Sequence, residues 1–552
     1  NQFNEPTVLF LYKHDNFERH VRGLAADGAS NVIVQIQGLP QNTLLSQVYL
    51  SLPEYEDGYL ENDASIENGV FTQTLRAPEF FVRSTNQSDD LNQCERDVGL
   101  TITYNGQDLQ HETLKLTRPP VVLLHGLWSD GSTWGSVVPY LTARHFKYIQ
   151  AHSYPNSLPF QYNSEVPFIA SMLALLRAAA DGIAASKVDM VGHSMGGVLA
   201  RRFGDKSYIK SITTIGSPHF GSPLADFVWA LRTNNWVTNL LIPYGLQGAL
   251  ADLRIIGGKN CLTQNCSSLN GIPNNVIAGV SSGSTLTGLG VYSQLLPISK
   301  FFRILPLNST VLDLKQHIFD GVRNDWVVSV SSQKGGYAAQ EENVLSHVHE
   351  TSDTGIMQKI ADFLNRTSND GFTTNSEHLG QFISGKHFPT VAEMPQSSGE
   401  IQITSPTEGQ VFRPGDTVNV SVTVSNNQAM VLIASSTEDA VLLEGEPFSC
   451  QFVIPENIVG SISITAAARD DAGFIGFVER TISVQTSLQL TSLSVYPEDS
   501  PLTFYADTSI PLLVLGRYED SSVRDLTASG SGTIYHSSNT SIVTISSDGL
   551  LS

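Results

Sequence analysis

One five-residue segment, Gly-His-Ser-Met-Gly at 192–196, constrains the fold of this chain more than any other feature. It follows the predicted strand 188–191 and opens a stretch, 195–203, that has helical spacing. A strand that turns directly into a helix holds the residue at the turn in a strained conformation, and glycines on either side let the chain pass closely. The segment therefore predicts that Ser194 is a nucleophile held above a sheet edge, at the positive end of a helix dipole that stabilises a developing anion.

The chain around this serine alternates strands with helices. The continuous apolar run 121–124 is typical of a strand that is buried on both faces of a parallel sheet. Further strands are expected at 148–152, 188–191, 212–215 and 276–280, and helices near 134–141, about 164–185, 195–203 and 355–364. Alternation over this length predicts a doubly wound α/β domain with a mostly parallel sheet, which we bound at 117–366.

Both flanks of this domain have the pattern of β-sheet proteins. Residues 1–116 alternate short β-branched runs with turn residues, which predicts an N-terminal β-sandwich domain. Residues 367–398 are polar with little periodicity and are interpreted as a linker or covering segment. Period-two alternation returns in 399–485, where Thr-Val-Asn-Val-Ser-Val-Thr-Val follows a Pro-Gly-Asp turn, and a second module, predicted to be truncated, covers 486–552.

The charge balance excludes one class of partner. The chain has 53 acidic and 32 basic side chains and a net charge of −21, which opposes binding to nucleic acid. No apolar run reaches the ~18 residues that cross a bilayer, and the best candidate, 169–185, contains Arg177 and Asp181. A charged fraction of only 15% suits an extracellular, β-rich protein. Because the chain begins at Asn1, we expect that a signal peptide was removed or never included, and that the protein is secreted or cell-surface.

Four cysteines are too few for a disulfide scaffold. Cys261 and Cys266 are close enough in sequence to close a small loop in an oxidising compartment. Cys94 and Cys450 fall in different predicted domains and are interpreted as free or buried thiols.

A serine nucleophile needs hydrogen-bond donors for the oxyanion of its tetrahedral intermediate. One donor is expected from the backbone amide after the nucleophile, which is that of Met195. The other is expected after an earlier strand, where His-Gly-Leu-Trp at 125–128 follows the apolar run 121–124. The sequence therefore predicts an oxyanion hole made of the Leu127 and Met195 amides, with His125 in a structural role that orients the loop.

The serine also needs a histidine to take its proton and a carboxylate to orient that histidine, in the order Ser, Asp, His along the chain. Asp325 is preferred as the acid because it lies in a loop directly before an apolar run. Asp320 is the competitor, and its simpler interpretation is a solvated turn aspartate.

Two histidines, His347 and His349, follow the acid, whereas His317 precedes it and breaks the expected order. His347 is preferred because it leaves room for a short loop before the closing helix. His347, His349 and Glu350 would make a metal site on paper, but the spacing found in zinc proteases is absent. We therefore predict a catalytic triad that ends in His347, with no metal and no cofactor.

Three motifs extend the pattern around these residues. They are Leu-His-Gly-Leu-Trp-Ser-Asp-Gly-Ser-Thr-Trp at 124–134, Lys-Val-Asp-Met-Val-Gly-His-Ser-Met-Gly-Gly-Val-Leu-Ala-Arg at 187–201 and Thr-Ile-Gly-Ser-Pro-His-Phe-Gly-Ser-Pro-Leu-Ala-Asp at 214–226. In this order they resemble bacterial lipases and esterases of the α/β-hydrolase superfamily, and also its GPI inositol-deacylase-like branch. The resemblance covers about 118–365 and implies an esterase or lipase with Ser194, Asp325 and His347 as its triad.

Two departures from that family matter. Many bacterial lipases have a calcium-binding Asp two residues after the histidine, but this chain has His349 there, so calcium is not carried over. The segment after Asp226, with Trp229, Trp236 and 240–242, lies where lipases have a lid. Its apolar residues suit either a lid at a lipid interface or the core of a cap domain.

The downstream modules resemble other families. Residues 401–424 look like the bacterial immunoglobulin-like modules found behind secreted enzymes, and 537–552 resemble the bacterial group-2 immunoglobulin-like repeat. The predicted fold class is therefore multidomain, with a central α/β-hydrolase flanked by all-β immunoglobulin-like sandwiches. Contact of these modules with a surface or a polymer is left open.

Together these features predict a secreted serine carboxylic ester hydrolase, an esterase or lipase that cleaves an ester or lipid substrate through an acyl-enzyme. Two rivals remain open. The same fold would serve an acyltransferase or an amidase. A surface adhesin with a vestigial hydrolase domain would instead work through its β modules.

Overall fold

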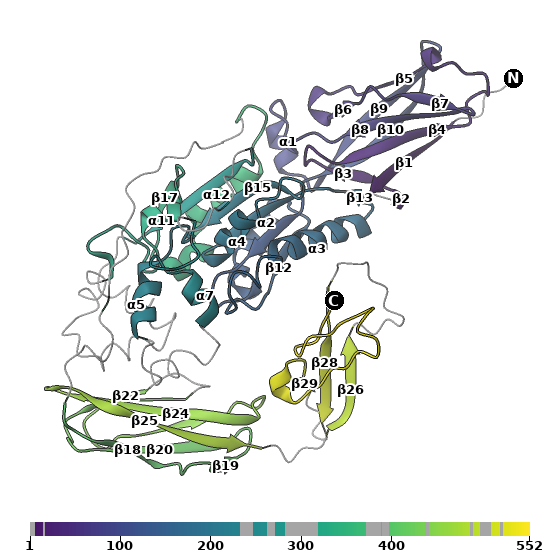
Figure 1. Cartoon of the computed structure of the whole chain (residues 1–552). Helices are drawn as coiled ribbons and strands as arrows, with labels where there is room; N and C mark the ends of the chain where they lie inside the picture. The colour runs from purple at the N-terminus through teal and green to yellow at the C-terminus, as the bar shows by residue number, and fades with distance from the viewer. Residues whose placement is uncertain are drawn as a thin grey trace. The chain divides into compact units, whose positions relative to one another are not determined.

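The computed structural model divides the chain into two compact units. The first unit contains the described residues up to 388, and the second contains those from 397 onward (Figure 1). The structure describes residues 6–14, 17–231, 247–261, 266, 271–281, 318–370, 388, 397–435, 441–485, 490–496, 509–518 and 523–552.

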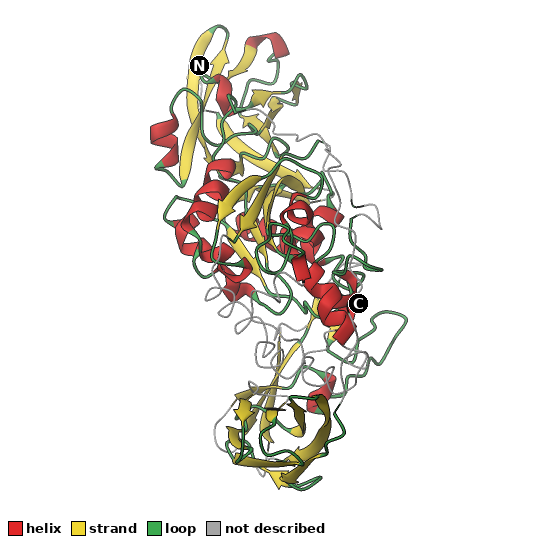
Figure 2. Ribbon diagram, turned by 90° about the vertical axis from the view of Figure 1, so that its left-hand side faces the viewer, coloured by secondary structure: helices red, strands yellow, loops and turns green. Residues whose placement is uncertain are grey.

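A parallel sheet with the strand order β12-β11-β14-β15-β16-β17 forms the centre of the first unit. β14 (Val188–His193) and β15 (Ile209–Ile215) are buried along their whole length, as expected for strands that are covered on both faces. Helices lie on both sides of this sheet (Figure 2). The predicted parallel α/β domain is thereby confirmed. The other strands are β11 (Val121–Leu124), β12 (Ile149–His152), β16 (Asn274–Val280) and β17 (Gln340–Asn343).

The helices of this domain pack their apolar faces on the sheet. One buried cluster joins Val191 of the sheet to Leu141 and Ile360 of two helices on the same side. The described helices are α2 (Val137–Thr142), α3 (Val166–Ala180), α4 (Met195–Phe203), α5 (Pro223–Leu231), α7 (Gln247–Asp252), α11 (Val330–Lys334) and α12 (Thr354–Leu364), with 3₁₀ turns η3 (Gly131–Trp134) and η4 (His347–Ser352).

Two largely antiparallel sheets share one core in the N-terminal part of this unit. Their strand orders are β2-β1-β4-β8-β6, with β7 paired to β8, and β13-β3-β10-β9-β5. Buried side chains from both sheets, such as Val34 and Leu100, belong to one cluster, which is the packing of a sandwich. The strands are β1 (Thr7–His14), β2 (Phe17–His20), β3 (Gly23–Ala25), β4 (Asn31–Gln37), β5 (Val48–Ser51), β6 (Tyr59–Leu60), β7 (Ser65–Glu67), β8 (Val70–Arg76), β9 (Glu95–Tyr104) and β10 (Gln107–Thr117), with the helix α1 (Gln87–Leu91) and 3₁₀ turns η1 (Leu45–Gln47) and η2 (Tyr55–Asp57).

The chain after α3 differs from the sequence-based expectation. The sequence predicts a helix to about residue 185, but α3 ends at Ala180. Gly182 has a φ of +73°, a left-handed conformation that favours glycine beyond a helix end. The next residues form β13 (Ile183–Ala184), which pairs in parallel with β3 of the sandwich (Figure 1). The α/β domain therefore supplies a strand to the neighbouring sheet, because pairing with that sheet edge overrides local helix propensity.

A buried aspartate also joins the sandwich to the chain that enters β14. The Asp27 Oδ2 atom accepts hydrogen bonds from the amides of Ser186 and Lys187 at 2.8 and 3.0 Å. Its Oδ1 atom accepts from the amides of Ala29 and Ser30. Burial of a carboxylate is costly unless donors satisfy it, and these amides do so. The backbone directly before β14 is thereby fixed to the sandwich.

The second unit contains two β modules. In the first module, sheets of order β18-β20-β23 and β19-β25-β24-β21-β22 share a buried core. β20 (Thr417–Val424) has the alternating burial that its period-two sequence predicts. The second module has the sheet β26-β28-β29 and the pair β27-β30. The remaining strands are β18 (Ile401–Ser405), β19 (Val411–Phe412), β21 (Met430–Ser435), β22 (Val441–Glu444), β23 (Ser449–Val453), β24 (Gly460–Asp470), β25 (Gly473–Val484), β26 (Leu490–Tyr496), β27 (Ile510–Pro511), β28 (Leu513–Tyr518), β29 (Val523–Asp525) and β30 (Leu550–Leu551), with the 3₁₀ turn η6 (Ser529–Ser531).

The cysteines agree with the sequence-based expectation. Cys261 and Cys266 form a disulfide, whereas Cys94 and Cys450 are not disulfide-bonded.

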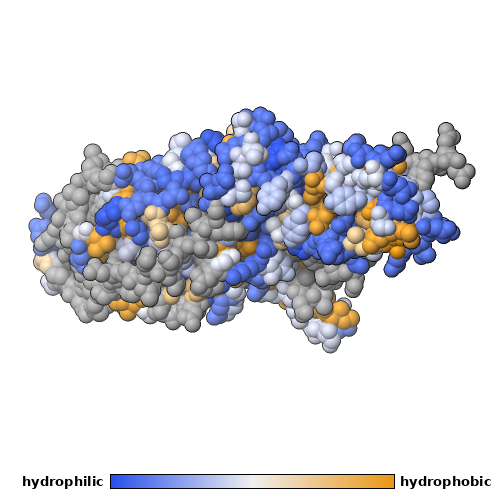
Figure 3. All heavy atoms as spheres, turned by 90° about the horizontal axis from the view of Figure 1, so that it is seen from above, coloured by the Kyte–Doolittle hydropathy of each residue, from blue (hydrophilic) through white to orange (hydrophobic). Residues whose placement is uncertain are grey.

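Among the residues that the structure describes, no helix is long and apolar enough to cross a membrane. Hydrophilic residues cover most of the described surface on the face shown in Figure 3.

Candidate active site

Ser194 lies on the sharp turn between β14 and α4. Its backbone angles are φ +54° and ψ −126°, a combination that few residues other than glycine adopt. The neighbouring glycines explain why the chain turns here. A Cβ at Gly192 would clash with the Gly197 backbone, and a Cβ at Gly196 would clash with the Leu124 carbonyl group. The strained strand–turn–helix that the sequence predicts is therefore confirmed.

The loop after β11 passes directly over Ser194. Gly126 comes so close that a Cβ there would lie 2.8 Å from the Ser194 Cβ and 3.2 Å from its Oγ. The Leu127 and Met195 amides belong to the two segments that meet at this hydroxyl. Among the described residues, neither amide donates a hydrogen bond, so both are available to a ligand. Their assignment to an oxyanion hole stays a prediction.

Asp325 and His347 form a buried hydrogen-bonded pair. The Asp325 Oδ2 atom lies 2.7 Å from the His347 Nδ1 atom, and the His347 amide donates to the Asp325 carbonyl oxygen at 2.9 Å. The Asp325 Oδ1 atom accepts from the amides of Val327 and Val328 at 2.8 and 2.6 Å. A carboxylate in this position keeps the imidazole proton on Nδ1, which leaves Nε2 free to accept another proton.

His193 connects this pair to the serine. The rings of His193 and His347 have their centroids 4.7 Å apart, and His193 Nε2 lies 3.2 Å from the His347 carbonyl oxygen. Because His193 directly precedes Ser194, the predicted base contacts the segment that carries the predicted nucleophile. Among the described residues, the His347 side chain bonds to Asp325, and no hydrogen bond joins it to the Ser194 hydroxyl. Such bonds commonly tighten only in the substrate complex.

The rival residues lie in other surroundings. Asp320 is exposed in a turn with φ +50°, whereas Asp325 is fully buried. The His349 Nδ1 atom lies 2.7 Å from the Ser346 Oγ atom. Trp229 lies on α5, where the Arg254 guanidinium stacks 4.2 Å from its ring centroid. The rival histidine His317 lies outside the described residues, and so do the remaining lid candidates, Trp236 and 240–242.

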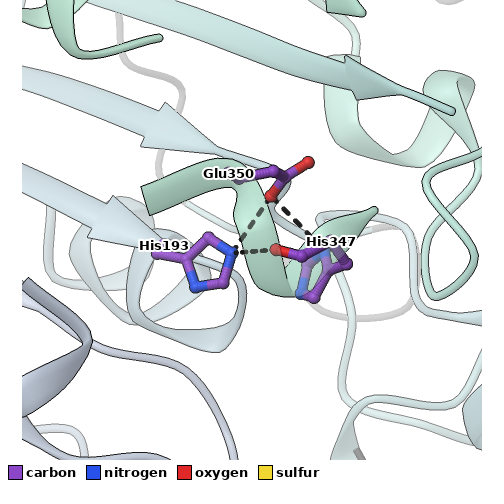
Figure 4. A group of neighbouring side chains, drawn as sticks. All are labelled: His193, His347 and Glu350. Carbon is purple, nitrogen blue, oxygen red and sulfur yellow. Dashed lines mark hydrogen bonds and ion pairs between the residues drawn. The ribbon is translucent and has the colours of Figure 1, made fainter. Parts of the chain in front are cut away.

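Glu350 and His193 form a pair that the sequence did not link to the triad. The Glu350 Oε2 atom lies 3.0 Å from His193 Nε2 and 3.4 Å from His347 Nδ1 (Figure 4). Two glycines at the ends of β15 and β16 make room for this carboxyl, because a Cβ at either Gly216 or Gly279 would clash with it. The one local signal in the sequence is the spacing of three residues between His347 and Glu350.

Burial controls the charge of this pair. Burial, together with the nearby Asp325 carboxylate, raises the pKa of Glu350 well above its usual value and favours the neutral acid. Burial and the neighbouring His347 lower the pKa of His193 well below its usual value, so its imidazole stays neutral. Since His193 Nε2 contacts a carbonyl oxygen, that nitrogen carries the proton and donates it. The pair thus contacts His347 without adding a second negative charge to that of Asp325.

The Glu350→Gln variant tests this assignment through stability. The contribution of Glu350 to the free energy of unfolding should fall as the pH rises above about 4.3, the ordinary pKa of glutamate, because the unfolded chain then releases a proton that the folded chain keeps. Glutamine does not titrate. Glu350→Gln should therefore gain stability relative to the wild type as the pH rises from about 4 to neutral, measured as Tm at each pH.

Glu341 provides a control of opposite sign. A hydrogen bond from Arg323 lowers the pKa of Glu341, so Glu341→Gln should be less stable than the wild type at neutral pH and should match it at acid pH. A Glu350→Gln variant with the same pattern as Glu341→Gln would show that Glu350 is ionised in the folded protein.

Within the described residues, His193, His347 and Glu350 each place one potential metal-ligand atom within 4.8 Å of the others. His349 is not in this group, so the set of His347, His349 and Glu350 considered from the sequence is not assembled. The three side chains already bond to one another or to Asp325. We assign no metal to them.

Known proteins match part of the first unit. Residues 121–258 match a family described as "Alpha/beta hydrolase family". A triacylglycerol lipase of Burkholderia plantarii is 32% identical over 138 residues, which are 24% of this chain and 38% of that protein. A triacylglycerol lipase of Pseudarthrobacter phenanthrenivorans is 33% identical over 124 residues, which are 21% of this chain and 38% of that protein. The chain thus spans 38% of the length of each of these relatives.

A solved structure also aligns with the chain. It is a lipase of Bacillus licheniformis in its mature form, with 18% identity and a TM-score of 0.31 over 44% of this chain and 89% of that chain. The immunoglobulin-like identity of the flanking modules stays a prediction. The parallel sheet and the strand–turn–helix at Ser194 give the central domain an α/β-hydrolase fold, and its residues 121–258 match the α/β-hydrolase family.

Proposed function

We propose that this chain is a secreted carboxylic ester hydrolase in which Ser194, His347 and Asp325 act as a catalytic triad. The observation that carries the proposal is the buried 2.7 Å hydrogen bond between His347 Nδ1 and Asp325 Oδ2, in the domain whose strand–helix turn presents Ser194. A histidine held in this tautomer accepts a proton at Nε2, as a serine nucleophile requires.

In the proposed reaction, Ser194 attacks the ester carbonyl carbon while His347 takes the hydroxyl proton. The Leu127 and Met195 amides donate hydrogen bonds to the oxyanion of the tetrahedral intermediate. His347 then gives the proton to the leaving alkoxide as the carbon–oxygen bond breaks, and the acyl group stays on the serine. Water attacks this acyl-enzyme with help from the same histidine and releases the carboxylic acid.

The comparisons and the disulfide support the finer parts of the proposal. Both curated relatives are triacylglycerol lipases, which supports an ester or lipid substrate. The disulfide between Cys261 and Cys266 supports an oxidising compartment, and so a secreted or cell-surface protein. The same proposal has three further parts. The α/β domain resembles the GPI inositol-deacylase-like branch. The β modules are immunoglobulin-like, and they contact a surface or a polymer. The net charge of −21 supports a partner other than nucleic acid.

A fluorophosphonate probe, which reacts with activated serines, tests the proposal. The wild type should be labelled at Ser194 and should hydrolyse p-nitrophenyl acetate. Ser194→Ala should lose both properties at an unchanged Tm, whereas Ser164→Ala, a change at an exposed serine, should keep both. A wild type that is neither labelled nor active would contradict the proposal and would favour an adhesin. A labelled enzyme that transfers its acyl group mainly to added alcohols or cleaves only amides would be an acyltransferase or an amidase.

A further inference from the structure

Two loops that leave neighbouring strands run side by side at Ser194. β11 and β12 pair in parallel, with Leu124 opposite His152. The loop after β11 carries the Leu127 amide. The loop after β12, residues 153–156, forms hydrogen bonds with the first loop at several points. The conformation around Leu127 therefore depends on the chain that follows β12.

Tyr154 anchors the chain on one side of Leu127. The Tyr154 ring stacks on the His125 ring with centroids 4.2 Å apart, and its hydroxyl donates to the His125 carbonyl oxygen at 2.5 Å. The Tyr154 amide donates to His125 Nε2 at 3.3 Å. Since Nε2 accepts, the His125 proton lies on Nδ1, which donates to the Gly126 carbonyl oxygen at 2.9 Å.

Asn156 anchors the chain on the other side of Leu127. Its Oδ1 atom accepts from the Trp128 amide at 2.6 Å, and its Nδ2 atom donates to the Ser129 carbonyl oxygen at 2.5 Å. Trp128 has a φ of +57°, a left-handed conformation that costs free energy for a bulky side chain and persists only where neighbours enforce it. One side-chain amide therefore satisfies a donor and an acceptor on the two residues that follow Leu127.

We infer that Asn156 is a positioning residue that holds the Leu127 amide where the oxyanion forms, an inference that rests on the proposed ester hydrolysis. Gly126 is packed against Ser194, and Trp128 is tied to Asn156, so Leu127 lies between two fixed points. Without Asn156, Trp128 can relax to a negative φ, and this rotation changes the direction in which the Leu127 amide points. Asn156 thus acts on the stabilisation of the transition state and leaves ground-state binding of the ester unchanged.

Kinetics of Asn156 variants test this inference. Asn156→Ala should lower kcat about 10- to 100-fold, less than deletion of a whole oxyanion donor, with KM within about twofold of the wild type. The affinity for a phenylboronic acid, which forms a tetrahedral adduct on the serine, should fall by a similar factor because the adduct uses the same amides. Asn156→Asp keeps the acceptor for the Trp128 amide and loses the donor to the Ser129 carbonyl oxygen. Its kcat should therefore lie between the kcat of the wild type and that of Asn156→Ala.

Asn163 provides the matched control. It is a buried asparagine in the same connection, its Nδ2 atom donates to the Leu158 carbonyl oxygen at 3.1 Å, and within the described chain it has no hydrogen bond to the loop after β11. Asn163→Ala should lower the Tm without lowering the kcat of the folded enzyme.

The outcomes separate the inference from the proposed function. A wild type without esterase turnover would contradict the proposed function and this inference together. An active wild type with Asn156→Ala within about twofold of its kcat, or with equal losses in Asn156→Ala and Asn163→Ala, would contradict the inference alone. If Asn156→Ala does not fold, the similarly sized Asn156→Leu decides, because it also removes both hydrogen bonds and a wild-type boronic acid affinity in that variant would overturn the role of Asn156.

Discussion

Replacement of His347 with alanine is expected to lower kcat by about 10⁴-fold or more with little change in KM, because Ser194 then has no base to take its proton. The remaining rate would come from the oxyanion hole and from substrate binding. Steady-state hydrolysis of a p-nitrophenyl ester measures the loss, and the Tm of the variant shows whether the fold is kept.

His349 is the matched control because it lies on the same 3₁₀ turn, two residues away. Its Nδ1 atom lies 2.7 Å from the Ser346 Oγ atom, whereas the His347 Nδ1 atom bonds to Asp325. His349→Ala should keep most of the wild-type kcat. Equal losses in both variants would indicate damage to the turn, and a loss confined to His349→Ala would move the base to His349.

Replacement of Asp325 with asparagine is expected to lower kcat by about 10⁴-fold through the tautomer of the histidine. The Oδ1 atom of Asp325 accepts from the amides of Val327 and Val328. In an asparagine at this position, the side-chain carbonyl oxygen would therefore face these two amides. Its NH₂ group would then face His347 Nδ1, which must become an acceptor. The imidazole proton moves to Nε2, and that nitrogen can no longer accept the serine proton.

Asp320→Asn is the control for this prediction. Asp320 is exposed and lies only five positions from Asp325, so its replacement should leave kcat and Tm close to the wild-type values. The comparison uses kcat at neutral pH and Tm for both variants. A normal kcat in Asp325→Asn together with a large loss in Asp320→Asn would reassign the acid to Asp320.

The part of the site that depends on local chemistry could be predicted from the sequence. Glycines around Ser194 are needed for the close passage of the chain, so they mark the turn, and α4 has the predicted bounds, Met195–Phe203. Asp325 and His347 were predicted from their order after Ser194, and the structure pairs them, while their catalytic roles stay a prediction. β11 was predicted from a continuous apolar run, since a strand that is covered on both faces has no polar face.

The parts that depend on distant contacts could not be predicted. Ile183–Ala184 has helical neighbours in sequence, and only the edge of β3, far away in the chain, makes it a strand. Glu350 contacts His193, which is 157 positions away in the sequence, and its carboxyl packs against Gly216 and Gly279. No local sequence pattern links these residues. Asn156 was missed for the same reason, because its partners follow a different strand.

The shared strand and the Asp27 contact mean that the sandwich and the α/β domain are not interchangeable pieces. A gene fusion that joined this α/β domain to an unrelated N-terminal module would leave Ile183–Ala184 without a sheet edge. It would also leave the amides of Ser186 and Lys187 without their acceptor, directly upstream of the strand that carries the nucleophile. Recombination during evolution is therefore expected to pass these two parts on as one inherited block.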